Sequence, residues 1–134
     1  MAGSNPVTIV TGASSGIGRA TARSLAAAGH RLGLIARRRD LLDALADEIR
    51  SSGGTVDVAP ADVGDRHSLR AAIGEIAGHL GPIDVLIANA GYGVPTRLDP
   101  LNIADVETTF RVNVMGVIYA IETVLPAIDR KSVV

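Results

Sequence analysis

The sequence predicts an α/β fold, a doubly wound parallel sheet of about four strands with helices on both faces. Three features of the 134 residues predict it: short apolar runs alternate with longer segments of helical periodicity, the runs are apolar enough to be buried on both sides, and the first run leads into a glycine-rich turn. Strands that alternate with helices pair in parallel through right-handed crossovers. We therefore expect residues 1–134 to form a single domain, with its strands in the order 3-2-1-4.

Four apolar runs are the expected strands. They are Val7–Val10, Leu32–Ala36, Val56–Ala59 and Val85–Ala88. Consecutive apolar positions are typical of parallel strands that are covered on both faces. With the order 3-2-1-4, Val85–Ala88 becomes an exposed edge strand, which is a template for pairing with another chain.

The segments that follow the first three strands have the spacing of amphipathic helices. The residues that recur at helical spacing are Ile17, Thr21, Leu25 and Ala28 in the first, Leu41, Leu45 and Ile49 in the second, and Leu69, Ile73, Ile76 and Leu80 in the third. Glycines after each segment can take the left-handed conformation that ends a helix, and Asp65 is the expected N-cap of the third helix.

A fourth helix is expected from about Asn102, after a turn-rich loop over Tyr92–Pro100. Its apolar positions are Ile103, Val106, Phe110, Val114, Val117, Ile121 and Leu125. The chain then continues to Val134, and Asp129–Val134 ends before a fifth strand would be complete. The apolar face of this fourth helix therefore lacks partner elements and is expected to be unusually exposed.

The turn after the first strand has the character of a phosphate-binding loop. Gly12 permits a sharp exit from the strand, Gly16 lets the backbone approach a pyrophosphate, and Gly18 allows close contact between helix and sheet. Free N–H groups at the start of the helix can then bind the anion. The spacing G-x-x-x-G-x-G differs from the common G-x-G-x-x-G, and the alternative is an ordinary tight turn. Its position between a strand and a helix favours nucleotide binding.

Four motifs resemble those of the short-chain dehydrogenase/reductase family, in the family's order and across essentially the whole chain. They are Thr11-Gly12-Ala13-Ser14-Ser15-Gly16-Ile17-Gly18, Asp62-Val63, Asn89-Ala90-Gly91 and Asn113. The resemblance implies a Rossmann-type domain that binds NAD(P) through these motifs, with the cofactor contacts of the first motif at Gly12, Ser14, Ser15, Gly16, Ile17 and Gly18. It further implies that Asp62 and Val63 contact the adenine, and that Asn89, Ala90 and Gly91 line the nicotinamide side.

Each of these motifs also has a plainer interpretation when taken alone. Asp62 is also suited to a turn, Asn89-Ala90-Gly91 to an ordinary strand exit in which Asn89 bonds neighbouring backbone, and Asn113 to a solvated helix face. The functional interpretation is favoured because the expected positions lie at or beside the carboxyl ends of strands, where open α/β sheets bind ligands.

The end of the second strand favours NADP over NAD. A site for NAD places an acidic residue there, which binds the ribose 2′-hydroxyl. Here the strand ends Ile35-Ala36-Arg37-Arg38, and the first carboxylate is Asp40. Arg37 and Arg38 can instead form charge-assisted hydrogen bonds with a 2′-phosphate. The alternative is that these arginines only solvate the start of a helix, which is a poor place for positive charge.

The resemblance implies catalytic residues of which this sequence holds one. The family uses a Ser, a Tyr-x-x-x-Lys motif and an Asn that anchors a water in the proton relay. Only Asn113 has a counterpart, because the sole lysine is Lys131 and Ala127 stands four residues before it. We expect the cofactor-binding part of an NADP-dependent oxidoreductase for alcohol or carbonyl substrates, without turnover of its own. The alternative is a non-catalytic dinucleotide-binding or interaction module that docks onto a full-length relative.

Composition excludes several other classes of protein. The net charge of −1 and the absence of clustered lysines argue against a nucleic-acid partner, and the absence of cysteine excludes disulfides and cysteine-ligated metals.

No signal peptide or membrane span is recognisable, so we expect a cytoplasmic protein. We also expect no metal site, and we expect the three histidines to be solvated. Because the family commonly assembles through its fourth helix, we expect a homo-oligomer.

Overall fold

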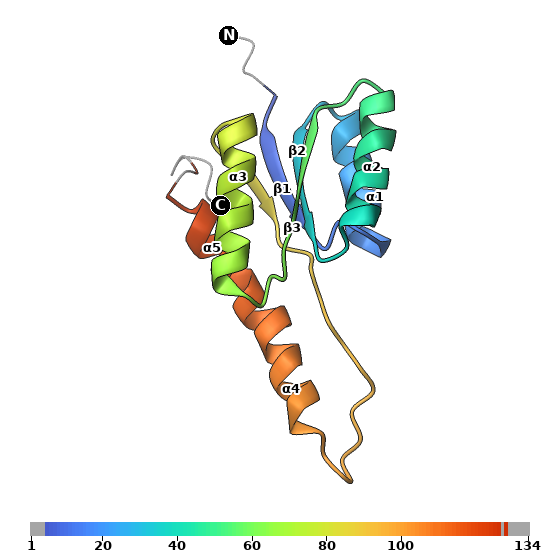
Figure 1. The fold of residues 1–134 in the computed structure, drawn as a ribbon, viewed down its shortest axis with the longest axis vertical. Coiled ribbons are helices and arrows are strands. Elements are labelled where there is room, and N and C mark those ends of the chain that lie inside the picture. Colours follow the sequence, from blue (N-terminus) through green and yellow to red (C-terminus); the bar gives the residue numbers. More distant parts are fainter. Residues whose placement is uncertain (1–4, 127, 129–134) are drawn as a thin grey trace.

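The computed structural model describes residues 5–126 and residue 128. Strands and helices alternate along most of this range (Figure 1). The elements are β1 (Val7–Thr11), α1 (Gly16–Ala27), β2 (Arg31–Ala36), α2 (Arg39–Ser51), β3 (Val56–Pro60), α3 (Arg66–Leu80), β4 (Val85–Ile87), α4 (Ile103–Phe110), the π-helical segment η1 (Arg111–Met115) and α5 (Gly116–Val124). The expected alternation of strand and helix is confirmed.

The four strands form one parallel sheet in the order β3-β2-β1-β4. In the register of this sheet, Ile9 of β1 lies between Gly33 of β2 and Leu86 of β4. The predicted strand order is therefore confirmed, and among the described residues β4 is an edge strand. All four strands end at the same side of the sheet, which is where their following loops meet.

Helices cover both faces of the sheet (Figure 1). Leu32 and Leu34 of β2 pack with α1 and α2 on one face, while Ile35 of the same strand packs with α3 and α5 on the other. Alternate residues of a strand point to opposite faces, so one apolar run can supply both cores. This accounts for the continuous apolar character of the central strands.

The third helix begins as its sequence predicts. Oδ1 of Asp65 accepts a hydrogen bond from the backbone N–H of Ser68 at 3.0 Å, which satisfies one of the free donors of the first turn. Leu69, Ile73 and Ile76 are buried against the sheet. The helix ends at Leu80, and Gly81 follows with φ +98°.

The expected fourth helix is a continuous helical run in three parts, α4, η1 and α5. Asn102 caps its start through a hydrogen bond from Asp105 N, and α4 together with the loop before it extends away from the sheet (Figure 1). Of the seven apolar positions predicted for this helix, five are exposed: Ile103, Phe110, Val114, Ile121 and Leu125. The face packed on the sheet is instead formed by Gly116, Ala120 and Val124.

Three further sequence predictions are corrected by the packing. Ile17 was expected on the buried face of α1, but it is 78% exposed at the open end of the sheet. β4 was expected to be buried on both faces, but its residues are half-buried because only one of its edges is paired in the described structure. His30 is half-buried rather than solvated, with Nδ1 2.7 Å from Oγ1 of buried Thr8. The expected start of a fifth strand over 129–134 lies outside the described residues.

Candidate functional site

A pocket of about 560 Å³ opens at the carboxyl ends of the strands. Its lining is drawn from the loops after all four strands and from the α4–η1 junction. The residues are Gly12, Ser14, Ser15, Gly16, Ile17, Ala36, Arg37, Arg38, Ala61, Asp62, Val63, Asn89, Ala90, Gly91, Tyr92, Thr108, Arg111 and Val112. The order 3-2-1-4 puts a topological switch between β1 and β4, which is where open α/β sheets hold ligands.

The glycine-rich turn forms the floor of this pocket. Gly12 has φ +67°, and a Cβ at this position would lie 2.8 Å from Cα of Ala90. A Cβ at Gly18 would overlap the carbonyl oxygen of Gly12 and lie 2.5 Å from Nδ2 of Asn89. The first turn of α1 therefore sits directly on the ends of β1 and β4, and its N-terminus faces the pocket.

Asn89 joins the ends of β1 and β4. Its Nδ2 lies 3.3 Å from the carbonyl oxygen of Thr11 and 3.4 Å from that of Gly12, while its own N–H donates to Oγ1 of Thr11 at 3.1 Å. Asn89 thus does bond neighbouring backbone, as its plainer interpretation has it, and it also lines the pocket. One side chain fixes both the glycine turn and the start of the next loop.

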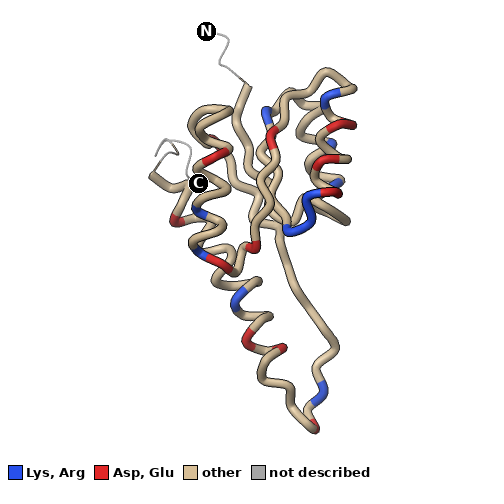
Figure 2. The backbone as a smooth tube through the Cα atoms, in the orientation of Figure 1, with Lys and Arg blue, Asp and Glu red and all other residues tan. Residues whose placement is uncertain are grey.

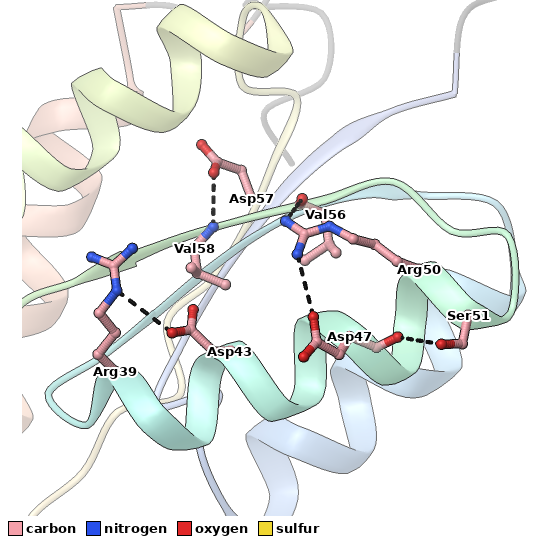
Figure 3. Close-up of polar contacts among 8 residues, drawn as sticks. All are labelled: Arg39, Asp43, Asp47, Arg50, Ser51, Val56, Asp57 and Val58. Atoms are coloured by element: carbon pink, nitrogen blue, oxygen red, sulfur yellow. Dashed lines mark hydrogen bonds and ion pairs between the residues drawn. The ribbon is translucent and has the colours of Figure 1, made fainter.

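Arg37 and Arg38 stand exposed at the rim of the pocket, where β2 ends. Figure 2 shows the positive charge gathered at the junction of β2 and α2. The next residue, Arg39, turns away to Asp43, with Nε 3.6 Å from Oδ2 (Figure 3). Within residues 5–126, no carboxylate lies within ion-pair distance of Arg37 or Arg38. Their charges are therefore available to an anionic ligand.

Asp62 and Val63 follow β3 on the opposite wall. Oδ1 of Asp62 accepts a hydrogen bond from Gly64 N at 2.9 Å, and its Oδ2 lies 3.3 Å from Nη1 of Arg111. A Cβ on Gly116 would lie 2.8 Å from Cγ2 of Val63, so the start of α5 packs tightly against this loop. The β3–α3 loop and the η1–α5 helix are thereby held together beside the pocket.

Asn113 lies on η1 and does not line the pocket directly. Its Oδ1 accepts a hydrogen bond from Tyr92 N at 2.7 Å, and its Nδ2 donates to Tyr92 O at 2.8 Å. Tyr92 itself is a lining residue. In the described structure, Asn113 thus holds the loop after β4 rather than presenting its amide to the pocket.

The structure brings the predicted cofactor-binding residues together. All of them line the pocket except Gly18, which supports it from beneath. Six further lining residues were not predicted from the sequence: Ala36, Ala61, Tyr92, Thr108, Arg111 and Val112. Ala36, Ala61 and Tyr92 adjoin predicted site residues, so proximity was a usable signal. Thr108, Arg111 and Val112 come from a helix whose position across the pocket no local pattern reveals.

Two kinds of site are absent from the described residues. No group of three His, Cys, Asp or Glu side chains in this part of the chain is placed to hold a metal ion. No helix within residues 5–126 is long and apolar enough to cross a membrane.

The parallel sheet, its switch point and the glycine floor define an α/β domain of the dinucleotide-binding type. The short chain dehydrogenase family profile matches residues 6–133, and the chain belongs to that family, whose members use NAD or NADP.

Three comparisons illustrate the relationship. An uncharacterised oxidoreductase of Mycobacterium bovis is 35% identical over 130 residues, which is 93% of this chain and 38% of that protein. An alcohol dehydrogenase from Thermococcus sibiricus, solved with 5-hydroxy-NADP, superposes with a TM-score of 0.87 and 35% identity over 91% of this chain and 52% of its own. A short chain dehydrogenase/reductase from Burkholderia phymatum, solved with NAD, gives a TM-score of 0.88 and 31% identity over 92% of this chain and 44% of its own. The chain spans about half the length or less of these relatives.

Proposed function

We propose that this chain binds NADP(H) as the cofactor-binding part of an oxidoreductase that acts on alcohol or carbonyl substrates. One observation carries the proposal: the pocket joins a glycine floor to a rim where β2 is followed by two arginines and no carboxylate. An NAD site would place an acid at that rim. A 2′-phosphate instead fits the free charges of Arg37 and Arg38.

The pocket fits a dinucleotide in shape as well as in charge. Side chains at Gly12 or Gly18 would fill or distort its floor, and its volume lies within the range of about 300–1,000 Å³ typical of ligand sites. The N-terminus of α1 would hold the pyrophosphate, while Asp62 and Val63 would face the adenine end and Asn89–Gly91 the nicotinamide end. When bound, NADP(H) supplies or accepts the hydride.

The comparisons support a nicotinamide dinucleotide as the cofactor, but they do not distinguish NADP from NAD. One solved relative holds an NADP derivative and another holds NAD, so relatives with either preference share this fold. The preference for NADP rests on Arg37 and Arg38. The substrate class rests on the family, because the described pocket offers no feature that distinguishes one alcohol or carbonyl compound from another.

We also propose that the 134-residue chain binds the cofactor without turning it over. Its two tyrosines are Tyr92 and Tyr119, and neither is followed four residues later by a lysine. Asn113, the remaining counterpart of the family's catalytic residues, is engaged with the backbone of Tyr92. Within the given sequence, coupled proton and hydride transfer therefore lacks the Tyr-x-x-x-Lys pair that serves the family as acid and base.

Fluorescence titration of the purified chain with NADPH and NADH tests the proposal. We expect the wild type to prefer NADPH and Arg37→Ala to weaken NADPH binding about tenfold while leaving NADH binding nearly unchanged. Arg38→Ala should act in the same direction. Arg39→Ala is the matched control, since Arg39 pairs with Asp43 outside the pocket lining.

Different outcomes overturn different parts of the proposal. Failure of the wild type to bind either dinucleotide would overturn the binding function, and an unchanged NADPH to NADH preference in both variants would overturn the choice of NADP. Oxidation of NADPH by the chain alone in the presence of carbonyl compounds would overturn the absence of turnover.

We propose a second copy of the chain as the partner of the helical run α4–η1–α5. Exposed apolar side chains recur along it at helical spacing: Ile103, Phe110, Val114, Met115, Ile118, Ile121 and Leu125. A surface of this kind marks an interaction site, and a two-fold axis would pair it with its own copy. Docking onto a full-length relative, the alternative function, would use the same surface together with the exposed edge of β4. The cytoplasmic location stays a prediction, to be tested by fractionation of expressing cells.

A further inference from the structure

The β3–α3 loop and the η1 segment meet in one contact that the proposed function does not use. Nη1 of Arg111 lies 3.3 Å from Oδ2 of Asp62, although 49 positions separate the two residues. Both residues also line the pocket. The contact therefore joins two walls of the site rather than two arbitrary surfaces.

The chain makes room for this contact. A Cβ on Gly64 would lie 2.6 Å from Nη1 of Arg111 and 3.1 Å from its Cγ, so the arginine stem lies directly over the α-carbon of Gly64. The N–H of Gly64 donates to Oδ1 of Asp62 at 2.9 Å. One carboxylate oxygen is thus held by its own loop and the other by Arg111, which fixes the plane of the carboxylate.

The ion pair between Arg111 and Asp62 adds little to the free energy of unfolding. The side chains of Arg111 and Asp62 are 45% and 38% exposed, and exposed ion pairs contribute about 0–1 kcal/mol. The useful effect is orientation, because a carboxylate oxygen with one partner retains a lone pair for another donor. A carboxylate held in one plane accepts an exocyclic amino group from a defined direction and repels a carbonyl oxygen in the same place.

We propose that Arg111 is a positioning residue for adenine recognition, holding Asp62 so that its carboxylate selects the amino group of adenine. This inference rests on the proposed function, since it requires a dinucleotide in the pocket. Arg111 acts through Asp62 and is not itself a catalytic residue. Its effect is confined to the base of the nucleotide and is absent for ligands without adenine.

The test measures dissociation constants for three ligands: NADPH, its hypoxanthine analogue deamino-NADPH, and reduced nicotinamide mononucleotide. The key variant is Arg111→Met, which keeps the stem over Gly64 and removes the guanidinium. We expect the wild type to prefer NADPH over the hypoxanthine analogue about tenfold and Arg111→Met to lower that preference to about threefold or less. Binding of the mononucleotide should not change.

A matched control separates this effect from general loosening of the helix. Arg66 forms a comparable exposed ion pair with Glu122 of α5, outside the pocket lining, so Arg66→Met should leave the preference for adenine unchanged. Asp62→Asn keeps an acceptor for Gly64 N and should abolish the preference by itself. Adding Arg111→Met to Asp62→Asn should then have no further effect on the ratio.

The possible results are distinguishable. Full preference for adenine in Arg111→Met, or equal losses for all three ligands, overturns the role of Arg111 while leaving the proposed function intact. A wild type that binds none of the three ligands overturns the proposed function, and the inference with it. Thermal unfolding of the ligand-free variants should give midpoints close to that of the wild type, and Asp62→Asn tests the same recognition if Arg111→Met fails to fold.

Discussion

Thr11 and Asn89 bind each other at the point where β1 and β4 end. The hydroxyl of Thr11, a residue only 2% exposed, accepts hydrogen bonds from the N–H groups of Asn89 and Ala90, both at 3.1 Å. In return, Nδ2 of Asn89 donates to Thr11 O at 3.3 Å. Two residues 78 positions apart thus fix the switch point of the sheet, and with it the geometry of the pocket floor.

Replacing Thr11 by Val should destabilise the chain. The substitution keeps the shape of the side chain but leaves the N–H groups of Asn89 and Ala90 without their acceptor, a loss of about 1–3 kcal/mol in the free energy of unfolding. Urea denaturation followed by circular dichroism measures it. Thr11→Ser, which keeps the hydroxyl, is the control and should lose less; a larger loss in Thr11→Ser would show that the methyl group dominates.

Gly18→Ala should disrupt the floor of the pocket. Its Cβ would overlap Gly12 O, and because that atom belongs to the backbone, relief requires α1 to move, at a cost of about 1–3 kcal/mol or more. Binding of NADPH should weaken with it. Gly74→Ala in α3 is the control, since apart from its own stretch of helix no described residue lies within 4 Å of the new Cβ, and it should stabilise the helix by about 0.5–1 kcal/mol. Equal effects of the two substitutions on unfolding would contradict this assignment.

His79 should make stability depend on pH. The hydrogen bond from its ring to Asp57 at 2.7 Å, together with the charges of Asp57 and Glu75, raises the pKa of His79 above its usual value of 6.5. The folded state therefore binds this proton more tightly than the unfolded state does. The added stability is fully present below about pH 6.5 and is lost as the pH rises through the raised pKa of the folded state.

Thermal unfolding of wild type and His79→Gln across this range measures the effect. The melting temperature of the wild type should exceed that of the variant by a small margin in mildly acidic buffer, and the two should converge in alkaline buffer. Added salt should reduce the margin, because the pair is exposed to solvent. A difference between the two proteins that grows with pH would contradict the assignment.

Polar substitutions on the exposed helical run should reduce self-association. Phe110 is 62% exposed and Ile118 is 49% exposed on the same run, so Phe110→Ser with Ile118→Ser should shift the chain toward the monomer in sedimentation velocity. Leu98→Ser is the control, because Leu98 is 89% exposed but lies in the loop before α4. A wild type that is monomeric at all accessible concentrations would exclude the second copy as partner.

Much of the fold was predictable because its signals are local. The apolar runs, helical spacing and glycines identified each strand and each helix, and the N-cap at Asp65 was predicted to the residue. Prediction failed at Ile17, which is exposed. Along α4–η1–α5 the exposure of the apolar face was predicted, but not that Gly116, Ala120 and Val124 form the packed face. Apolar spacing shows that a helix has an apolar face, but it does not show whether anything covers that face.

The sequence by itself determined the class of this protein, because spacing within single segments encodes the strands, the glycine turn and the charge at the end of β2. Only the tertiary structure decided which contacts join the helical run α4–η1–α5 to the loops around the pocket. Arg111 reaches Asp62 and Asn113 holds Tyr92 because α5 packs closely on the β3–α3 loop, where Gly116 meets Val63. Such contacts depend on how one helix sits on a distant loop, and they leave no periodic signal in either segment.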